Sequence, residues 1–365
     1  MARPLFYHRS STFRDLLRQV TDDLQHVYCT RQPVLTLTAS GTGGMEAALA
    51  SPLSPGARVL CLISGRWGER WRNIARALGH EVVSVTVPPG QAVAPEQLAE
   101  ALRQHPDTQA VCATLCETAT GVKNDVAAFG RIVASTPALL LVDSIAGLGC
   151  MECRTDDWHI DLNVTGSQKA LMLPPGLAFV SVSDKAWRKI DSATGPRGFY
   201  FDLRKYRDAL TTGDSPFTPA LTLVRGLRVS LARMRRESNE QRWARYARLA
   251  SAARAGVLAL NLELLAAVPA ESLTVINVPS ALDGQALLTR LEREHGIKLA
   301  GGQDALKGKV LRLAHMGNID DADILAALSA LERVLLEMGH DLDPGAGVAA
   351  AQRVLAEPVP TLNMV

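Results

Sequence analysis

The 365-residue sequence has few aromatic residues, lysines and cysteines, and it has no apolar run of membrane-spanning length. A membrane helix needs about 20 consecutive apolar residues. Residues 1–8 also lack the hydrophobic core of a secretory signal. The six scattered cysteines lie partly in apolar runs, which is typical of buried thiols rather than of a disulfide framework. We therefore expect a soluble cytoplasmic protein without structural disulfides.

Charge of one sign is also missing, since 39 basic residues are balanced by 37 acidic ones and the net charge is +2. We do not expect so balanced a chain to bind nucleic acid or a membrane surface through a basic field. Only eight of the basic residues are lysines. Any chemistry that requires a lysine amine therefore has eight candidates, which are Lys123, Lys169, Lys185, Lys189, Lys205, Lys298, Lys307 and Lys309.

Short apolar runs alternate with helix-forming stretches through the first half of the chain. We expect strands at residues 34–39, 58–63, 81–87, 110–115, 138–142, 162–165 and 178–182. Helices are expected at 12–30, 67–78, 95–105 and 126–134. Apolar strands that alternate with helices predict an α/β fold, in which helices sandwich a mostly parallel sheet.

The pattern changes after about residue 216. An arginine-rich helical stretch covers about 220–260, and we expect its charges (Arg233, Arg235, Arg236, Arg242 and Arg245) to form a solvated face. Strands at 273–278 and 309–314, with helices at 284–294 and 320–338, predict a small α+β domain. The expected division is a large domain over 1–245, a small domain over 246–340 and a tail over 341–365, with one helix at 348–355.

Ligands of open α/β sheets bind beyond the carboxyl ends of the strands, so the residues found there carry most of the functional information. After the first predicted strand, the segment 40–44 (Ser-Gly-Thr-Gly-Gly) opens a helix. Such a helix start can bind a phosphate through its free N–H groups, but it can equally be an ordinary tight turn. After the second strand, Trp67 lies between two glycines. It is either a packing residue or a flat face for a cofactor.

Two further strand ends carry groups with distinctive chemistry. Asp143 ends an apolar strand, where it could cap the next segment or bind a cationic group such as a protonated pyridine nitrogen. Lys169 lies in a polar, glycine-bounded turn between apolar segments. A partly desolvated lysine has a lowered pKa and can form a Schiff base.

These parts together match the needs of one cofactor, pyridoxal 5'-phosphate. It requires a phosphate cradle, a stacking aromatic ring, an acidic partner for the pyridine nitrogen and a Schiff-base lysine. The chain offers them in the order Thr42 to Gly44, Trp67, Asp143 and Lys169. The set is far more specific than any of its members.

At these same positions the sequence resembles the class V aminotransferases, and most of all their alanine–glyoxylate and serine–pyruvate branch. The resemblance covers about residues 6–340. The segments that carry it are Ser40–Ala47, Glu117–Val122, Val142–Ser144 and Gly166–Leu171. It implies a PLP fold-type I homodimer with its active site at the subunit interface.

The resemblance also assigns roles to individual residues. Lys169 would form the internal aldimine and move the proton between the substrate Cα and the cofactor. Asp143 would pair with the pyridine nitrogen, and Trp67 would stack on the ring. Thr42, Gly43 and Gly44 would bind the cofactor phosphate, with Gln168 beside it, and Thr118 would lie near the ring hydroxyl. Thr218 would reach the phosphate in the neighbouring subunit, and Arg312 would bind the substrate carboxylate.

The implied reaction is a ping-pong transamination from a small amino acid, of alanine or serine type, to a short 2-oxo acid such as glyoxylate or pyruvate. Several positions depart from the family pattern: the segment before His8 is short, Ser215 stands where a tyrosine is common, and Ala119 and Cys116 replace small polar residues. A PLP-dependent lyase, decarboxylase or racemase on the same fold is therefore the second interpretation. A catalytically inactive binding protein is the third.

Three remaining residue groups have conventional structural interpretations. Cys150 and Cys153 form a lone C-x-x-C without a second pair, so we expect two idle thiols and no metal site. We do not favour Cys116 as a nucleophile. His315 is expected to be structural, although it lies near the predicted carboxylate site.

Overall fold

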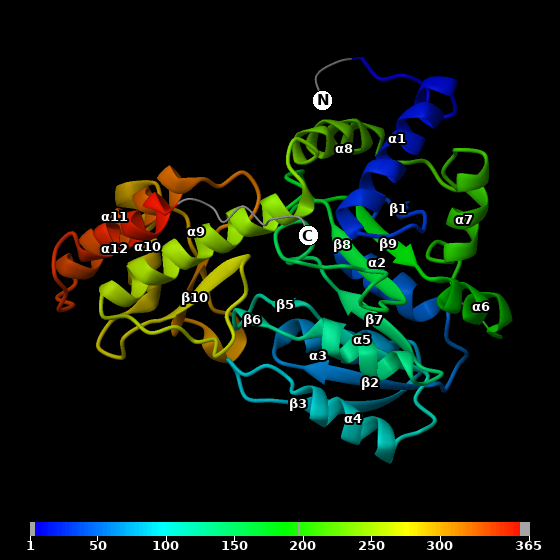
Figure 1. Ribbon diagram of the computed structural model, residues 1–365, viewed down its shortest axis with the longest axis horizontal. Helices are drawn as coiled ribbons and strands as arrows, with labels where there is room; N and C mark the ends of the chain where they lie inside the picture. Colours follow the sequence, from blue (N-terminus) through cyan, green and yellow to red (C-terminus); the bar gives the residue numbers. More distant parts are fainter. Residues whose placement is uncertain (1–3, 196–197, 358–365) are drawn as a thin grey trace.

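A seven-stranded sheet forms the centre of the large domain in the computed structural model, which describes residues 4–195 and 198–357 (Figure 1). Across the sheet the strands run in the order β1, β9, β8, β7, β4, β2, β3, and only β9 is antiparallel to its neighbours. Their bounds are β1 Leu35–Leu37, β2 Arg58–Ile63, β3 Glu81–Thr86, β4 Ala110–Thr114, β7 Leu139–Asp143, β8 Leu162–Gly166 and β9 Ala178–Val182. The mostly parallel α/β sheet that the sequence predicts is confirmed.

Helices cover both faces of this sheet, because successive strand residues point to opposite sides and both sides are apolar. In β2, Leu60 and Leu62 face the core formed with α1, α4, α5 and α8, whereas Val59 and Cys61 face the core formed with α2, α3, α6 and α7. The helices are α1 Ser11–Tyr28, α2 Gly41–Ala50, α3 Arg66–Ala77, α4 Pro95–Gln104, α5 Val126–Ala134, α6 Asp184–Ser192, α7 Leu203–Thr211 and α8 Leu221–Met234.

A small antiparallel sheet and its helices form the second part of the molecule, at the left of Figure 1. Its strand order is β10, β12, β11. Its elements are α9 Asn239–Ala259, β10 Leu273–Asn277, α10 Gly284–His295, β11 Ala300–Gly301, the 3-10 turn η1 Asp304–Leu306, β12 Val310–Ala314, α11 Asp321–Glu337 and α12 Ala346–Ala356. A hairpin of β5 (Cys116–Glu117) and β6 (Val122–Lys123) lies where the two parts meet.

The arginine-rich stretch differs from the sequence prediction in two ways. It is two helices, α8 and α9, because Ser238 caps a new helix start: its side chain accepts from the Gln241 N–H, and Gln241 bonds back to Ser238. Arg242 is also buried rather than solvated, with 1% of its surface exposed.

Arg242 is satisfied inside the protein by acceptors from three segments. Its guanidinium donates to the Gly149 carbonyl at 2.9 Å, to the Met234 carbonyl at 3.1 Å and to the Asn239 side-chain oxygen. A buried charge with this many acceptors is a structural clamp. Arg233, Arg235 and Arg236 are exposed, as expected.

The predicted domain boundary at residue 245 falls within α9, so one helix connects the two parts. Within the segment predicted as a tail, α12 packs along α9. Residues 358–365 of that segment lie outside the described part of the chain.

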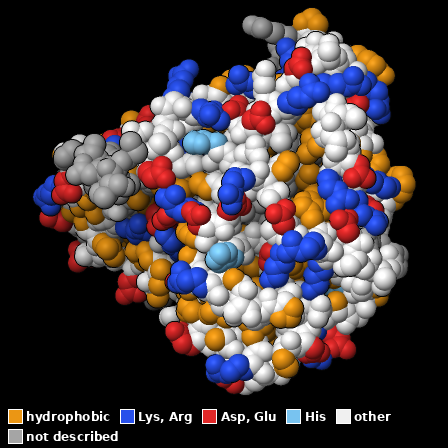
Figure 2. Space-filling model, turned by 45° about the vertical axis from the view of Figure 1, so that its right-hand side comes forward, with side chains coloured by type: hydrophobic (Ala, Val, Ile, Leu, Met, Phe, Trp, Pro, Cys, Tyr) orange, Lys and Arg blue, Asp and Glu red, His pale blue; other side chains and the backbone are white. Residues whose placement is uncertain are grey.

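The described surface is mixed in charge. Figure 2 shows basic and acidic side chains interspersed over the face that it presents. No helix within the described residues combines the length and the apolar character needed to cross a membrane.

Candidate active site

The predicted site residues converge on one edge of the large sheet. Parallel strands β8, β7, β4 and β2 are neighbours, so their carboxyl ends meet at that edge. Lys169 follows β8, Asp143 ends β7, Thr118 follows the β4–β5 segment and Trp67 follows β2. The sheet order therefore brings together four residues that lie far apart in the sequence.

Trp67 lies in the first turn of α3, which begins at Arg66, one residue before the start that the sequence predicts. Its indole Nε1–H donates to the Thr118 hydroxyl at 2.6 Å, and its backbone N–H donates to the Glu117 carboxylate at 2.8 Å. These two bonds fix the ring, half-buried, at the site edge. The orientation fits a stacking surface better than a core packing residue.

Glu117 is a site residue that the sequence interpretation did not single out. Its fully buried carboxylate accepts from the N–H groups of Trp67, Gly68 and Ala119, and it thereby caps the N-terminus of α3. Burial raises the pKa of Glu117 to about 7 against these N–H bonds, and the nearby Asp143 carboxylate raises it further.

Arg70 is a second residue that was missed. It lies one turn after Trp67, and its guanidinium lies over the Trp67 ring at 4.3 Å from the centroid. The same group donates to the Thr42 hydroxyl at 2.7 Å. Arg70 therefore links the predicted ring-stacking residue to the predicted phosphate cradle. Its sequence signal is only the i, i+3 spacing from Trp67.

Asp143 is 4% exposed, and burial raises the pKa of its carboxyl group to about 6. The Ile145 N–H, which donates to it at 2.9 Å, and the positive charges of Arg70 and Lys169 act in the opposite direction. A buried carboxyl group with a raised pKa is an incompletely compensated site, so a cationic ligand would be bound favourably there.

Lys169 lies in the turn after β8, half-buried, and its positive charge acts on Asp143. Burial lowers the pKa of a different lysine, Lys189, to about 8. The Lys189 ammonium donates to the carbonyl of Gln109, which precedes β4, so it lies at the opposite edge of the sheet. Geometry therefore favours Lys169 as the reactive amine.

Arg312 reaches the site from β12 of the small domain. Its guanidinium donates to the Thr118 carbonyl at 3.2 Å and to the Gly301 carbonyl at 2.8 Å. Burial lowers the pKa of Arg312, and the neighbouring charge of Arg66 lowers it further. The Arg312 guanidinium has further N–H donors, which could bind a carboxylate ligand.

The segment 41–44 forms the first turn of α2, with Thr42 pointing its hydroxyl at Arg70. Gly44 is required for packing, because a Cβ there would come within 2.8 Å of the Val164 side chain on β8. Close packing brings this helix start to the site edge, and this position is compatible with anion binding there.

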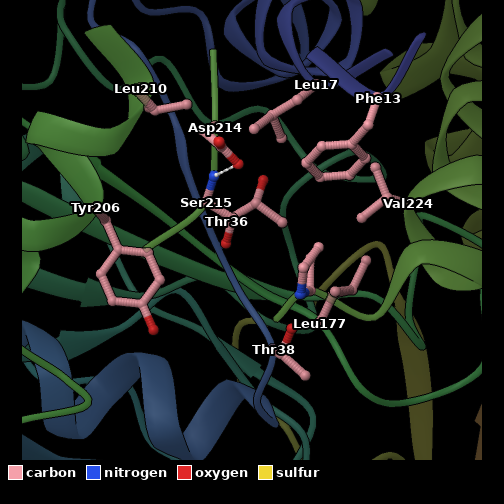
Figure 3. A pocket seen from close by; sticks show the side chains of 11 residues that line it. Phe13, Leu17, Thr36, Thr38, Leu177, Tyr206, Leu210, Asp214, Ser215 and Val224 are labelled. Carbon is pink, nitrogen blue, oxygen red and sulfur yellow. Dashed lines mark hydrogen bonds between the residues drawn. The ribbon is translucent and has the colours of Figure 1, made fainter. Parts of the chain in front are cut away.

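Two predicted site residues are exposed. Gln168 lies beside Lys169, and Thr218 lies on the loop between α7 and α8. The same loop closes a cavity of about 10 Å³ between α1, α7 and β1, where the Asp214 carboxylate accepts from the Ser215 N–H (Figure 3). That cavity has room for about one water and none for a cofactor.

The remaining candidates are buried and inert. Cys116 bonds Ser272 at 3.0 Å, and burial raises its pKa to about 12, which disfavours the nucleophilic thiolate. His315 is fully buried between Thr274 and the Glu271 carbonyl, as a structural residue would be. Cys150 and Cys153 are free buried thiols, as expected. No cluster of three metal-ligating side chains occurs among residues 4–195 and 198–357.

This set of groups fits pyridoxal 5'-phosphate. The site offers an amine on Lys169, a buried carboxyl group on Asp143 and an oriented indole on Trp67. The start of α2 and the Arg70 cation suit a phosphate group. Each group lies at the end of a different strand or helix, so a flat, charged ligand could contact all of them.

Comparison with known proteins agrees with this chemistry. The family described as aminotransferase class V matches residues 3–318. The chain is 42% identical to a Synechococcus sp. protein named soluble hydrogenase, small subunit, over 96% of this chain and 92% of that protein. It is 37% identical to the L-aspartate–glyoxylate aminotransferase of Paracoccus denitrificans, over 96% of this chain and 90% of that protein.

Among solved structures, the pyridoxamine–pyruvate aminotransferase of Mesorhizobium loti superposes with a TM-score of 0.92 at 30% identity, over 97% of this chain and 92% of that one. The sheet order, the residues gathered at its edge and these matches lead to one assignment. The chain belongs to the class V aminotransferase family, which uses pyridoxal 5'-phosphate.

Proposed function

We propose that the chain transfers the amine of a small amino acid, of alanine or serine type, to a short 2-oxo acid such as glyoxylate or pyruvate. The observation that carries this is the position of Lys169 and Asp143 at the ends of neighbouring strands, with Arg312 reaching the same edge. Relatives named for aspartate or serine donors and for glyoxylate as acceptor support the choice of substrates.

The proposed roles follow from the position of each group. The Lys169 amine accepts and returns the proton at the substrate Cα, because it is the site amine whose charge reaches Asp143. Asp143 holds a proton on the ring nitrogen through its buried carboxylate. When bound, the cofactor supplies a carbonyl carbon for the amine and a ring that withdraws electrons.

The other residues bind and orient. Arg312 pairs with the substrate carboxylate as a two-pronged donor. Trp67, held by Thr118 and Glu117, packs on the ring and keeps water from one face. Thr42, Gly43, Gly44 and Gln168 contact the phosphate, and Thr118 lies by the ring hydroxyl.

We also propose a homodimer in which Thr218 reaches the phosphate of the partner's site. A cluster of aromatic side chains near Thr218 supports this. Phe217 lies on the same loop and stacks on Tyr200, with their ring centroids 4.6 Å apart, and the neighbouring Phe199 is 74% exposed. A cytoplasmic location is proposed because all six cysteines are free thiols.

The function is tested by adding the amino donor alone to the cofactor-loaded protein. Transamination predicts conversion of the cofactor's visible absorbance to that of its amine form, with release of one oxo acid per site. Release of carbon dioxide, ammonia or the inverted amino acid would instead support a decarboxylase, lyase or racemase. A loaded protein that changes no donor would support the inactive binding protein.

The lysine assignment has its own test. Borohydride reduction of the loaded protein followed by peptide mapping should place the cofactor on Lys169. Lys189→Ala is the matched control, because Lys189 is the lysine whose pKa burial lowers most clearly. A label on any lysine other than Lys169 would contradict the assignment.

A further inference from the structure

Two arginines at the site are held by one short segment of the small domain. Arg312 donates to the carbonyl of Gly301 at 2.8 Å, and Arg66 pairs with the Asp304 carboxylate at 2.9 Å. Gly301 ends β11 and Asp304 begins the turn η1, so only two residues separate them. Both guanidinium groups therefore lie along the same edge of the small domain.

Arg66 belongs to the large domain and begins α3 directly before Trp67. Its pair with Asp304 thus joins the two domains next to the residue proposed to stack on the cofactor. Arg312 already has a proposed role at the site, and Arg66 is a second cationic group beside it. The function proposed above does not use it.

The electrostatic coupling between these groups supports their proximity. Burial lowers the pKa of Arg312 and that of Arg70, and the charge of Arg66 lowers both further. Glu117 is the carboxylate that acts on Arg312 in the opposite direction. Arg66 thus repels both Arg312 and Arg70, and a local excess of positive charge suits a ligand with more than one negative charge.

The partner that Arg66 has in this structure is easily replaced. The side chain of Asp304 is 71% exposed and that of Arg66 is 36% exposed, so water screens the pair. Asp304 also has a φ of +49°, a left-handed conformation that a non-glycine residue adopts at some cost. A ligand carboxylate with the same chemistry as Asp304 could therefore exchange with it.

We propose that Arg66 binds the side-chain carboxylate of a dicarboxylic amino donor, while Arg312 binds its α-carboxylate. The inference rests on the proposed function and adds a four-carbon dicarboxylic amino acid of aspartate type to its donors. Asp304 occupies Arg66 in the free enzyme and is displaced when that donor enters. The exchange breaks one ion pair and forms another, and the released Asp304 carboxylate, whose side chain is 71% exposed, is solvated by water.

The test is the selectivity between aspartate and alanine as amino donors. Arg66→Ala should lower the ratio of kcat/KM for aspartate to that for alanine by about tenfold or more, because a charge-assisted hydrogen bond is lost. Arg66→Lys should recover part of the ratio. Arg76→Ala is the matched control, since Arg76 is exposed on the same helix.

Asp304→Asn tests the exchange itself. Removing the competing carboxylate should lower the aspartate concentration that gives half-maximal conversion, whereas that for alanine should change by less than about twofold. Succinate binding, measured by calorimetry on the loaded protein, gives a readout without turnover. Its Kd should rise by about tenfold or more in Arg66→Ala.

The failures of the two proposals are distinguishable. If alanine and aspartate both leave the cofactor spectrum unchanged, the proposed transamination is wrong, and succinate binding then decides the role of Arg66. If Arg66→Ala leaves both the selectivity ratio and the succinate Kd unchanged, or if the wild-type protein binds no succinate, the inference about Arg66 is overturned.

Discussion

Asp143 is the residue whose environment is most closely matched to its proposed task. It is 4% exposed, at the mouth of β7, and its pKa is raised to about 6. A cationic ring nitrogen would supply the charge that this carboxylate lacks. Binding of the cofactor and ionisation of Asp143 should therefore support each other.

We expect Asp143→Asn to lower kcat for transamination by about 100-fold or more, because the ring nitrogen loses its anionic partner. Steady-state kinetics at saturating cofactor measure this. Asp161→Asn is the matched control: Asp161 is also buried, but it lies before β8 and bonds Leu140 and Ser183 at the opposite edge. Equal losses in the two variants would contradict the role of Asp143.

His315 gives the protein a predictable response to acid. Burial lowers its pKa to about 3, whereas the unfolded chain protonates near 6.5. Between these values the unfolded state binds more protons, so the free energy of unfolding falls as the pH falls.

From pH 6.5 to pH 5, His315 should contribute a loss of about 2 kcal/mol. His315→Gln keeps a donor and an acceptor for Glu271 and Thr274 but cannot titrate. Denaturant unfolding at pH 7 and pH 5 should therefore show a smaller difference for the variant. An equal difference would mean that His315 binds protons equally in the folded and unfolded states, and that burial does not lower its pKa.

Residues at strand ends were predictable, and residues defined by tertiary contacts were not. Lys169 and Asp143 follow recognisable strands, so the rule for open sheets finds them from the sequence. Glu117 bonds a backbone 50 residues away, and Arg66 bonds a partner 238 residues away. No local sequence pattern predicts hydrogen bonds between residues so far apart in the chain. Arg242 was mispredicted for the same reason, because its acceptors come from separate segments.

Among the elements, α3 carries the largest share of the site, and its position depends on Gly68. A Cβ at Gly68 would come within 2.6 Å of the Leu62 carbonyl and 2.8 Å of the Ile63 Cα on β2. Neither backbone atom can move without distorting the strand. The helix can therefore lie this close to the sheet only with glycine at that position.

Gly68→Ala should destabilise the protein by about 1–3 kcal/mol and weaken cofactor binding, because α3 must shift and take Trp67 with it. Thermal unfolding and a cofactor titration followed by Trp fluorescence measure the two effects. Arg76→Ala, on the exposed side of the same helix, should change neither by much. Loss of stability without loss of affinity would mean that Trp67 does not depend on the helix position.

The boundaries of most elements could also be predicted, within one or two residues at each end. The short strands β5, β6 and β11 and the helices α6 and α7 were not predicted, and in the stretch over 220–260 helix-forming composition continues through the break between α8 and α9. The capping box at Ser238 and Gln241 is the local signal that marks the second helix start. Composition alone could not show it.

At the scale of the whole molecule, the proposed dimer predicts sites that are shared between subunits. Lys169→Ala should inactivate its own site, and Thr218→Asp should repel the phosphate in its partner's site. A mixed dimer of the two variants would contain one site with both wild-type residues. Random mixing should therefore restore about a quarter of the wild-type activity at limiting cofactor.

Coexpression of the two variants with different affinity tags allows the mixed dimers to be purified, and these should have about half of the wild-type activity. The double variant, with both changes in one chain, is the control and should stay inactive when it is mixed with either single variant. Activity that stays absent in the mixed dimer would contradict the assignment of Thr218 to the neighbouring site.

Arg242 connects three segments at the junction between the two domains by hydrogen bonds. It binds the last turn of α8 through Met234, the start of α9 through Asn239, and the loop after Asp143 through Gly149. Because α9 leads into the small domain that carries Arg312, a rotation of that domain pulls on the same loop. Arg242 thus helps to set the position of Arg312, on the small domain, relative to Asp143, on the large one.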